Sequence, residues 1–159
     1  MNPSESTSIS ANASVPNRRS LDNESNITTT NETNLEPSMA KVLLVDDHSD
    51  IRRLVRITLG KTFEVLEAED GTSALEIVRR QKPELVVLDI MMPGELDGLQ
   101  VLDAIKADAN LAATRVIMVT ARGQAQDYDY GMQHGADAYF IKPFSPLQLV
   151  ASIKEILAR

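Results

Sequence analysis

The chain has 159 residues, of which 43% are hydrophobic, and this is enough for one domain of ordinary size with a packed core. Its formal net charge of -7 argues against direct nucleic-acid binding, because phosphate backbones are bound by clustered Lys and Arg. The absence of cysteine excludes disulfides, thiolate metal sites and cysteine nucleophiles, and it fits a reducing cytoplasm.

No stretch approaches the roughly 18 consecutive apolar residues of a membrane-spanning helix. The N-terminus also lacks the basic start and apolar core of a signal peptide. We therefore expect a cytoplasmic protein without membrane insertion.

Residues 1–38 are rich in Ser, Thr and Asn and contain only isolated apolar side chains. Such a segment cannot bury enough surface to offset the entropy lost on ordering, so we predict a disordered tail. Met39 stands directly before the first apolar segment, and we hypothesise that translation of the native protein begins there. Residues 39–159 then form the folded domain.

Five short apolar segments follow, and most of them lack the alternation of apolar and polar residues that a half-exposed strand shows. Continuous apolar runs of this length are typical of parallel strands that are covered on both faces. The second segment contains two glutamates and is predicted to be less buried than the others. The predicted strands are residues 42–45, 63–68, 85–88, 116–119 and 138–141.

Between the strands, apolar side chains recur at the spacing of amphipathic helices. Ser49 is expected to cap the first helix, which Gly60 ends, and Ser145 to cap the last, which Pro146 opens. The predicted helices are residues 50–59, 72–80, 99–107, 125–134 and 146–157.

Strands that alternate with helices through short, right-handed connections predict an α/β fold, a doubly wound parallel sheet of five strands with five helices. In such a sheet the carboxyl ends of the strands lie along one edge, where ligands bind.

Polar side chains stand at four of these five strand ends. Asp46 and Asp47 follow the first strand, Asp89 follows the third, Thr120 the fourth and Lys142 the fifth. Each residue alone has an ordinary interpretation as a loop acid, a turn cap or a surface charge. Their coincidence at one edge favours a reactive site.

Carboxylates about 4 to 6 Å apart would repel one another by roughly 3 to 4 kcal/mol per pair at an effective dielectric constant of 20. The site therefore needs a cation. Because only oxygen ligands are available, Mg²⁺ fits best, held by carboxylates and water with places left for phosphate oxygens. The pattern predicts phosphoryl transfer.

Further short motifs accompany the polar strand ends. The whole set is the Asp46-Asp47 pair, the strand before Asp89, Met91-Met92-Pro93-Gly94, Thr120-Ala121, Tyr139 and Lys142-Pro143-Phe144. This combination resembles the receiver domain of response regulators over residues 40–159. The resemblance, and not the sequence pattern, implies a flavodoxin-like strand order of 2-1-3-4-5. The loop from Pro93 to Gly98 is one residue longer than the common form of the family, which affects partner contacts more than chemistry.

The resemblance implies that Asp89 accepts a phosphoryl group from a phosphohistidine, giving an aspartyl phosphate. Asp47, Asp89 and the backbone carbonyl of Met91 would hold Mg²⁺, and Asp46 would act mainly through a bound water. Met91 and Arg122 would flank the route of the water that hydrolyses the phosphate.

The resemblance also implies how phosphate is contacted and how the signal leaves the site. Lys142 would place its ammonium on one phosphate oxygen, through a cis Lys142–Pro143 bond, and the Thr120 hydroxyl would donate to another. Thr120 would then shift toward the phosphate, Tyr139 would turn inward, and the surface formed by residues 125–159 would change.

The implied phosphoryl donor is a histidine kinase or a histidine phosphotransfer protein, and the implied output is a protein target that binds residues 125–159. Because the last predicted helix ends the chain, we expect a single-domain regulator. We expect no enzyme activity beyond its own phosphorylation and slow autodephosphorylation.

Two alternatives remain. A receiver-like interaction module could bind a partner without phosphorylation, but such modules usually lack an acid or the lysine, and all are present here. An aspartyl-phosphate phosphatase needs a second acid two residues after its nucleophile, where this chain has Met91. His48 and His134 are expected to be solvated and to take no part in phosphotransfer.

Overall fold

The computed structural model describes residues 39–121 and 125–159. In these ranges the chain forms five strands and five helices that alternate, as the sequence predicts. They are β1 (Lys41–Val45), α2 (Ser49–Leu59), β2 (Glu64–Ala68), α3 (Gly71–Gln81), β3 (Leu85–Asp89), α4 (Gly98–Ala107), β4 (Arg115–Thr120), α5 (Ala125–Gln133), β5 (Ala138–Ile141) and α6 (Pro146–Leu157).

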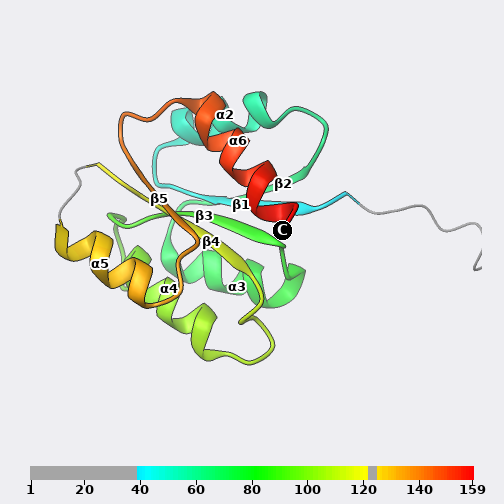
Figure 1. Ribbon diagram of the computed structural model, residues 1–159. Helices are drawn as coiled ribbons and strands as arrows, with labels where there is room; N and C mark the ends of the chain where they lie inside the picture. The colour runs from blue at the N-terminus through cyan, green and yellow to red at the C-terminus, as the bar shows by residue number, and fades with distance from the viewer. Residues whose placement is uncertain (1–38, 122–124) are drawn as a thin grey trace, which may run out of the picture. The chain divides into compact units, whose positions relative to one another are not determined.

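The strands form one parallel sheet in the order β2-β1-β3-β4-β5, which confirms the doubly wound fold and the order that the resemblance implies. The register places Leu43 of β1 opposite Leu66 of β2 and Val86 of β3. Helices α2 and α6 cover one face of the sheet, and α3, α4 and α5 cover the other (Figure 1).

Strand β3 shows why its sequence lacks polar alternation. Val86 and Leu88 pack into the core under α3 and α4, whereas Leu85 and Val87 pack into the core under α2 and α6. All four side chains are buried, and each contributes about 1.5 to 3 kcal/mol by leaving water. The strand is therefore fixed from both faces, and so is the position of Asp89 at its end.

The start of α2 differs from the prediction. Ser49 is the first residue of the helix, and its N-cap position is held by His48, whose side chain makes no capping bond. The backbone N–H of His48 instead donates to Asp46 Oδ1 at 2.8 Å. The turn after β1 is thus shaped by an acid of the candidate site rather than by a serine. The predicted roles of Gly60 and Ser145 are confirmed.

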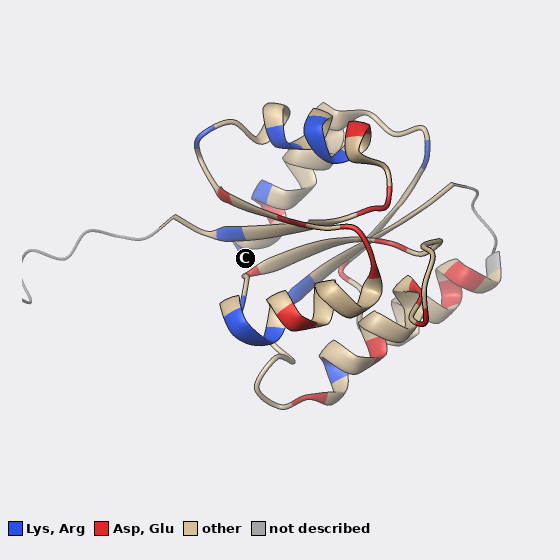
Figure 2. Ribbon diagram, turned by 180° about the vertical axis from the view of Figure 1, so that it is seen from behind, with Lys and Arg blue, Asp and Glu red and all other residues tan. Residues whose placement is uncertain are grey.

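Charge is distributed unevenly over the helices (Figure 2). Helix α2 carries three arginines, and α5, on the opposite face, carries two aspartates and no basic residue.

Residues Met39–Arg159 form one compact unit. Within the described ranges, no helix combines the length and the apolar character needed to cross a membrane. The predictions for the tail of residues 1–38 and for Arg122 lie outside the described residues.

Candidate functional site

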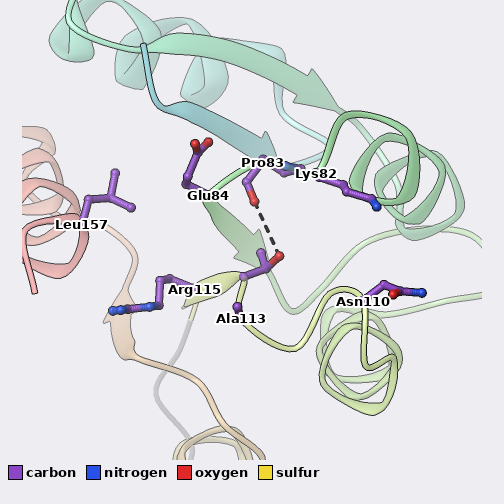
Figure 3. A pocket seen from close by; sticks show the side chains of 8 residues that line it. Lys82, Pro83, Glu84, Asn110, Ala113, Arg115 and Leu157 are labelled. Atoms are coloured by element: carbon purple, nitrogen blue, oxygen red, sulfur yellow. Dashed lines mark hydrogen bonds between the residues drawn. The ribbon is translucent and has the colours of Figure 1, made fainter. Parts of the chain in front are cut away.

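The amino ends of β3 and β4 border a cavity of about 390 Å³ (Figure 3). Its polar groups largely serve the fold: the Glu84 carboxylate accepts from the backbone N–H of Lys41 at 2.8 Å, and Arg115 donates to the carbonyl of Ile156 at 3.1 Å. Among the residues that the structure describes, no set of carboxylates comes together at this end of the sheet. The candidate site lies at the opposite end.

The carboxyl ends of four strands supply the candidate site, as the sequence predicts. Asp46 and Asp47 directly follow β1, Asp89 ends β3, Thr120 ends β4, and Lys142 directly follows β5. The backbone hydrogen bonds between β4 and β5 continue as far as the site, since the N–H of Lys142 donates to the carbonyl of Thr120 at 2.6 Å. The sheet therefore sets the spacing of the functional groups.

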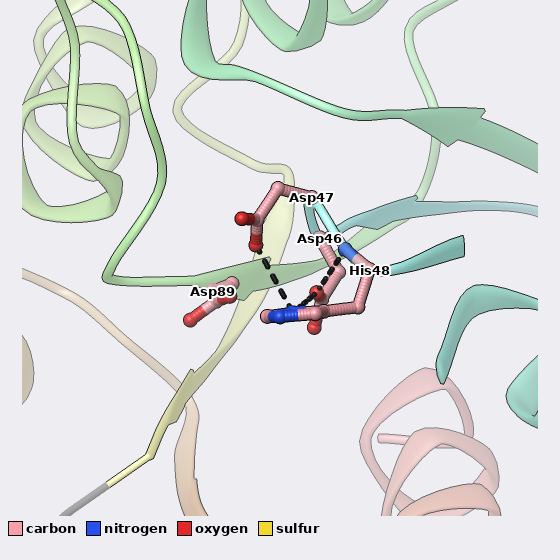
Figure 4. Close-up of side chains that lie close together, drawn as sticks. All are labelled: Asp46, Asp47, His48 and Asp89. Carbon is pink, nitrogen blue, oxygen red and sulfur yellow. Dashed lines mark hydrogen bonds and ion pairs between the residues drawn. The ribbon is translucent and has the colours of Figure 1, made fainter. Parts of the chain in front are cut away.

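The acids converge on one another (Figure 4). Potential ligand atoms of Asp46, Asp47, His48 and Asp89 all lie within 4.8 Å of one another. Asp46 and Asp89 are buried, whereas Asp47 is exposed to solvent. The pocket has the chemistry of a metal site with one open side, and it fits a hard cation with oxygen ligands.

Lys142 joins two of these acids. Its Nζ lies 2.8 Å from Asp46 Oδ2 and 3.1 Å from Asp89 Oδ2, and its side chain is only 14% exposed. The Lys142–Pro143 peptide bond is cis, as the resemblance implies. Proximity of Lys142 to Asp89 was predicted, but its shorter contact with Asp46 was not.

The charges of the pocket perturb one another. Burial and the neighbouring charge of Asp46 raise the pKa of Asp89, and Lys142 only partly opposes them. Burial lowers the pKa of Lys142, but its contacts with Asp46 and Asp89 outweigh burial and raise that pKa. Lys142 therefore stays charged, and the ionised form of Asp89 is less favoured than that of a free aspartate.

Gly98 is a residue that the sequence reasoning missed. A Cβ on Gly98 would lie 2.2 Å from the backbone oxygen of Asp89, and the Gly98 N–H donates to the carbonyl of Ile90 at 2.9 Å. Because α4 starts directly against the backbone of the acidic strand end, only glycine fits there. The available signal was a glycine at the start of a helix, next to the capping residue Asp97.

His48 also has a place that the sequence did not reveal. Its side chain is 63% exposed, in line with the prediction, but its Nδ1 lies 3.1 Å from Asp46 Oδ1 and 3.2 Å from Asp47 Oδ1. The ring therefore borders the acidic pocket. Its position directly after the two aspartates was the only hint.

Thr120 and Tyr139 lie on neighbouring strands at the α5 side of the pocket. Thr120 is buried, and its neighbour Val119 is the register partner of Asp89. The Tyr139 hydroxyl is buried and, among the described residues, has no hydrogen-bond partner. Burial and the charge of Asp127 raise the pKa of this phenol, and the nearby Thr120 side chain, which does not reach good hydrogen-bond geometry, lowers it only in part. The Tyr139 ring packs edge-on against Tyr128 of α5 with centroids 5.2 Å apart, so strand and helix are in contact.

The sequence profile of the response regulator receiver domain matches residues 42–154. The chain belongs to the response regulator receiver family. It is thus a receiver domain of the two-component response regulators, and the match includes every predicted site residue.

Curated relatives of this receiver domain include the probable transcriptional regulator ycf27 of Porphyra purpurea, 41% identical over 126 residues, or 79% of this chain and 50% of that protein. The phosphate regulon transcriptional regulatory protein PhoB of Escherichia coli K12 is 39% identical over 120 residues, or 75% of this chain and 52% of that protein. The chain spans about half the length of the curated relatives it matches. Both are named as transcriptional regulators, so a single-domain regulator without a nucleic-acid partner stays a prediction.

Solved structures give the same assignment. The BeF3-activated receiver domain of DrrB, from Thermotoga maritima, is 31% identical with a TM-score of 0.70, over 77% of this chain and 100% of that one. The chemotaxis response regulator CheY4 of Vibrio cholerae is 30% identical with a TM-score of 0.69, over 75% of this chain and 99% of that one.

Proposed function

We propose that this receiver domain accepts a phosphoryl group on Asp89 from a phosphohistidine of a histidine kinase or histidine phosphotransfer protein. The observation that carries the proposal is the ammonium of Lys142, 3.1 Å from Asp89 Oδ2, in a pocket where the acids lie within 4.8 Å of one another. A buried carboxylate beside a fixed cation is the arrangement that a transferred phosphoryl group requires.

Mg²⁺ is the cation that we propose for the pocket. The carboxylates of Asp47 and Asp89 and the backbone carbonyl of Met91 would hold it, and Asp46 would act mainly through a bound water. A cation here would relieve the repulsion by which Asp46 helps to raise the pKa of Asp89. When bound, Mg²⁺ supplies charge that offsets the repulsion between an anionic acceptor and an anionic phosphoryl group.

In the proposed reaction, one Asp89 oxygen forms a bond to phosphorus while the bond from phosphorus to the imidazole nitrogen breaks. The imidazole leaves with the electron pair of that bond. The Lys142 ammonium would contact one phosphoryl oxygen, and the Thr120 hydroxyl would donate to another. Lys142 needs little movement, because its Nζ already lies between Asp46 and Asp89.

The proposed output is a change of the surface formed by residues 125–159, which would bind a downstream protein. Phosphorylation adds about -1.5 to -2 charges at Asp89, which would draw the Thr120 hydroxyl toward the new oxygens. Tyr139 would respond because its buried hydroxyl lies close to the Thr120 side chain, so a movement of Thr120 would change its surroundings. Moving the active form from about 1% to 99% of the population requires about 5.5 kcal/mol.

In this proposal the protein is a single-domain phosphoryl acceptor in the cytoplasm and not an enzyme that turns over a free substrate. The residue two positions after Asp89 is Met91, whose exposed side chain offers no general acid for rapid hydrolysis. A slow autodephosphorylation is the expected fate of the aspartyl phosphate.

The test is labelling by acetyl phosphate in the presence and absence of Mg²⁺, with the product measured by intact mass. We expect the wild type to gain one phosphoryl group only with Mg²⁺, and Asp89→Asn to gain none. Asp50→Asn is the matched control, because it removes the charge of an exposed aspartate near the start of α2. An unlabelled wild type would instead support a receiver-like module that works without phosphorylation.

A further inference from the structure

Asp46, the residue before Asp47, is anchored to β2 through both its backbone N–H and its backbone carbonyl. The backbone N–H of Asp46 donates to the carbonyl of Ala68 at 3.1 Å. The carbonyl oxygen of Asp46 accepts from Nη1 of Arg52 at 2.6 Å, and Nε of the same guanidinium donates to Glu67 Oε1 at 2.8 Å. The last two residues of β2 thus hold the residue that precedes Asp47, one directly and one through Arg52.

The guanidinium is well suited to this connection. Arg52 is 14% exposed and presents donors in a fixed plane, so one edge binds the Glu67 carboxylate while another donor binds the Asp46 carbonyl. Burial alone would raise the pKa of Glu67, but Arg52 and Arg56 outweigh burial and lower that pKa. Glu67 therefore stays ionised. Its carboxylate balances the charge of Arg52, so Arg52 has an ionic partner other than the acids of the pocket.

We propose that Arg52, held by Glu67, is a positioning residue that fixes the orientation of the two acids after β1. The inference rests on the proposed function, because it concerns the metal and phosphoryl site. If the Asp46 carbonyl were released, the peptide group between Asp46 and Asp47 could rotate, and the Asp47 carboxylate would move relative to Asp89. Strand β2 supplies no side chain to the pocket itself, and its contribution is this anchor.

Groups that orient metal ligands from outside the ligand shell typically change metal affinity by about 10- to 100-fold when removed. We therefore expect Arg52→Ala and Glu67→Gln each to raise the Kd for Mg²⁺ by about tenfold, measured by titration calorimetry. Labelling by acetyl phosphate at a fixed, subsaturating Mg²⁺ concentration should slow in parallel. Arg52→Lys keeps the charge but cannot make both contacts, so it should not restore the affinity.

Arg56→Ala is the matched control. Arg56 lies one helical turn from Arg52 and pairs with the same carboxylate, with Nη2 at 2.5 Å from Glu67 Oε2, but it does not contact Asp46. Removing Arg56 should lower the melting temperature only slightly, because a partly exposed ion pair contributes little to stability. The Mg²⁺ affinity should stay at the wild-type value.

The outcomes separate the two proposals. A wild type that neither binds Mg²⁺ nor becomes labelled contradicts the proposed function. The positioning role alone is overturned if the wild type binds Mg²⁺ and becomes labelled, but the folded Arg52→Lys and Glu67→Gln variants keep the wild-type Mg²⁺ affinity. A lower melting temperature of these variants would not change that conclusion. Glu67→Gln keeps the test decisive if Arg52→Ala does not fold.

Discussion

Among the described residues, Asp89 is the aspartate whose ionised form the fold disfavours. It is 2% exposed, and its pKa is raised by burial and by Asp46 despite the ion pair with Lys142. At neutral pH its charge therefore destabilises the metal-free fold, and the same charge is what the proposed reaction uses.

Asp89→Asn should consequently raise the melting temperature of the metal-free protein by a few degrees at neutral pH. The folded state keeps a proton on Asp89 to a higher pH than the unfolded chain does, so wild-type stability falls relative to the variant as pH rises between the two pKa values. Below the ordinary aspartate pKa of about 3.9 the difference should vanish. Thermal unfolding in a chelator across this pH range measures it, and Asp50→Asn should show no such gain.

Two glycines make a second test at the level of single residues. Gly98→Ala should cost about 1 to 3 kcal/mol and slow phosphorylation, because its Cβ would press on the backbone oxygen of Asp89. Gly131→Ala should instead stabilise by about 0.5 to 1 kcal/mol, since it lies within α5 and its Cβ would meet Met118 at an ordinary 3.6 Å. Denaturant unfolding of both variants measures the two effects, and equal losses would contradict the steric argument.

At the level of elements, the sequence predicts the contacts that the topology of the sheet fixes and misses those that depend on how two elements pack. Asp46, Asp89 and Lys142 were found because parallel strands bring their carboxyl ends to one edge whatever their side chains do. The contact of Arg52 with the Asp46 carbonyl has no such signal. This contact depends on the angle between α2 and the sheet, and the spacing of apolar residues does not encode that angle.

Helices α4 and α5 show the same limit. His134 is exposed, as predicted, but the sequence did not reveal its contacts. Its Nδ1 lies 2.8 Å from Asp103 Oδ1 of α4, and its ring stacks on Tyr130 with centroids 3.9 Å apart. The Tyr130 hydroxyl donates to the other oxygen of Asp103. This polar cluster joins the helix that follows the acidic strand to the helix of the proposed output surface.

The cluster should be visible in the titration of Tyr130. Its pKa is raised, first by the hydrogen bond to Asp103, then by burial and by the Asp103 charge. Asp103→Asn should return this pKa toward the ordinary tyrosine value, which NMR of the ring carbon next to the hydroxyl can follow. The Tyr139 resonance is an internal control, because its raised pKa comes from burial and Asp127. An unshifted Tyr130 would mean that the two helices are not joined in solution.

At the level of the whole molecule, a metal bound in the acidic pocket would be coupled to folding. The carboxylates meet only when β1 and β3 are paired in the sheet, so the unfolded chain offers no equivalent site. The formal net charge of -7 adds a general attraction for cations that is separate from the pocket. A measurement of stability must therefore distinguish a specific site from screening.

Mg²⁺ at about 100 times its Kd should stabilise the fold by about 2.7 kcal/mol, because it binds the folded state alone. The expected observation is a melting temperature that rises with the logarithm of Mg²⁺ concentration, at an ionic strength held constant with NaCl. Asp47→Asn should lose most of this rise, because Asp47 is a proposed ligand on the open side of the pocket. Asp108→Asn, at the far end of α4, should keep it. A rise of equal size in both variants would assign the effect to screening of the net charge and leave the pocket without its proposed ion.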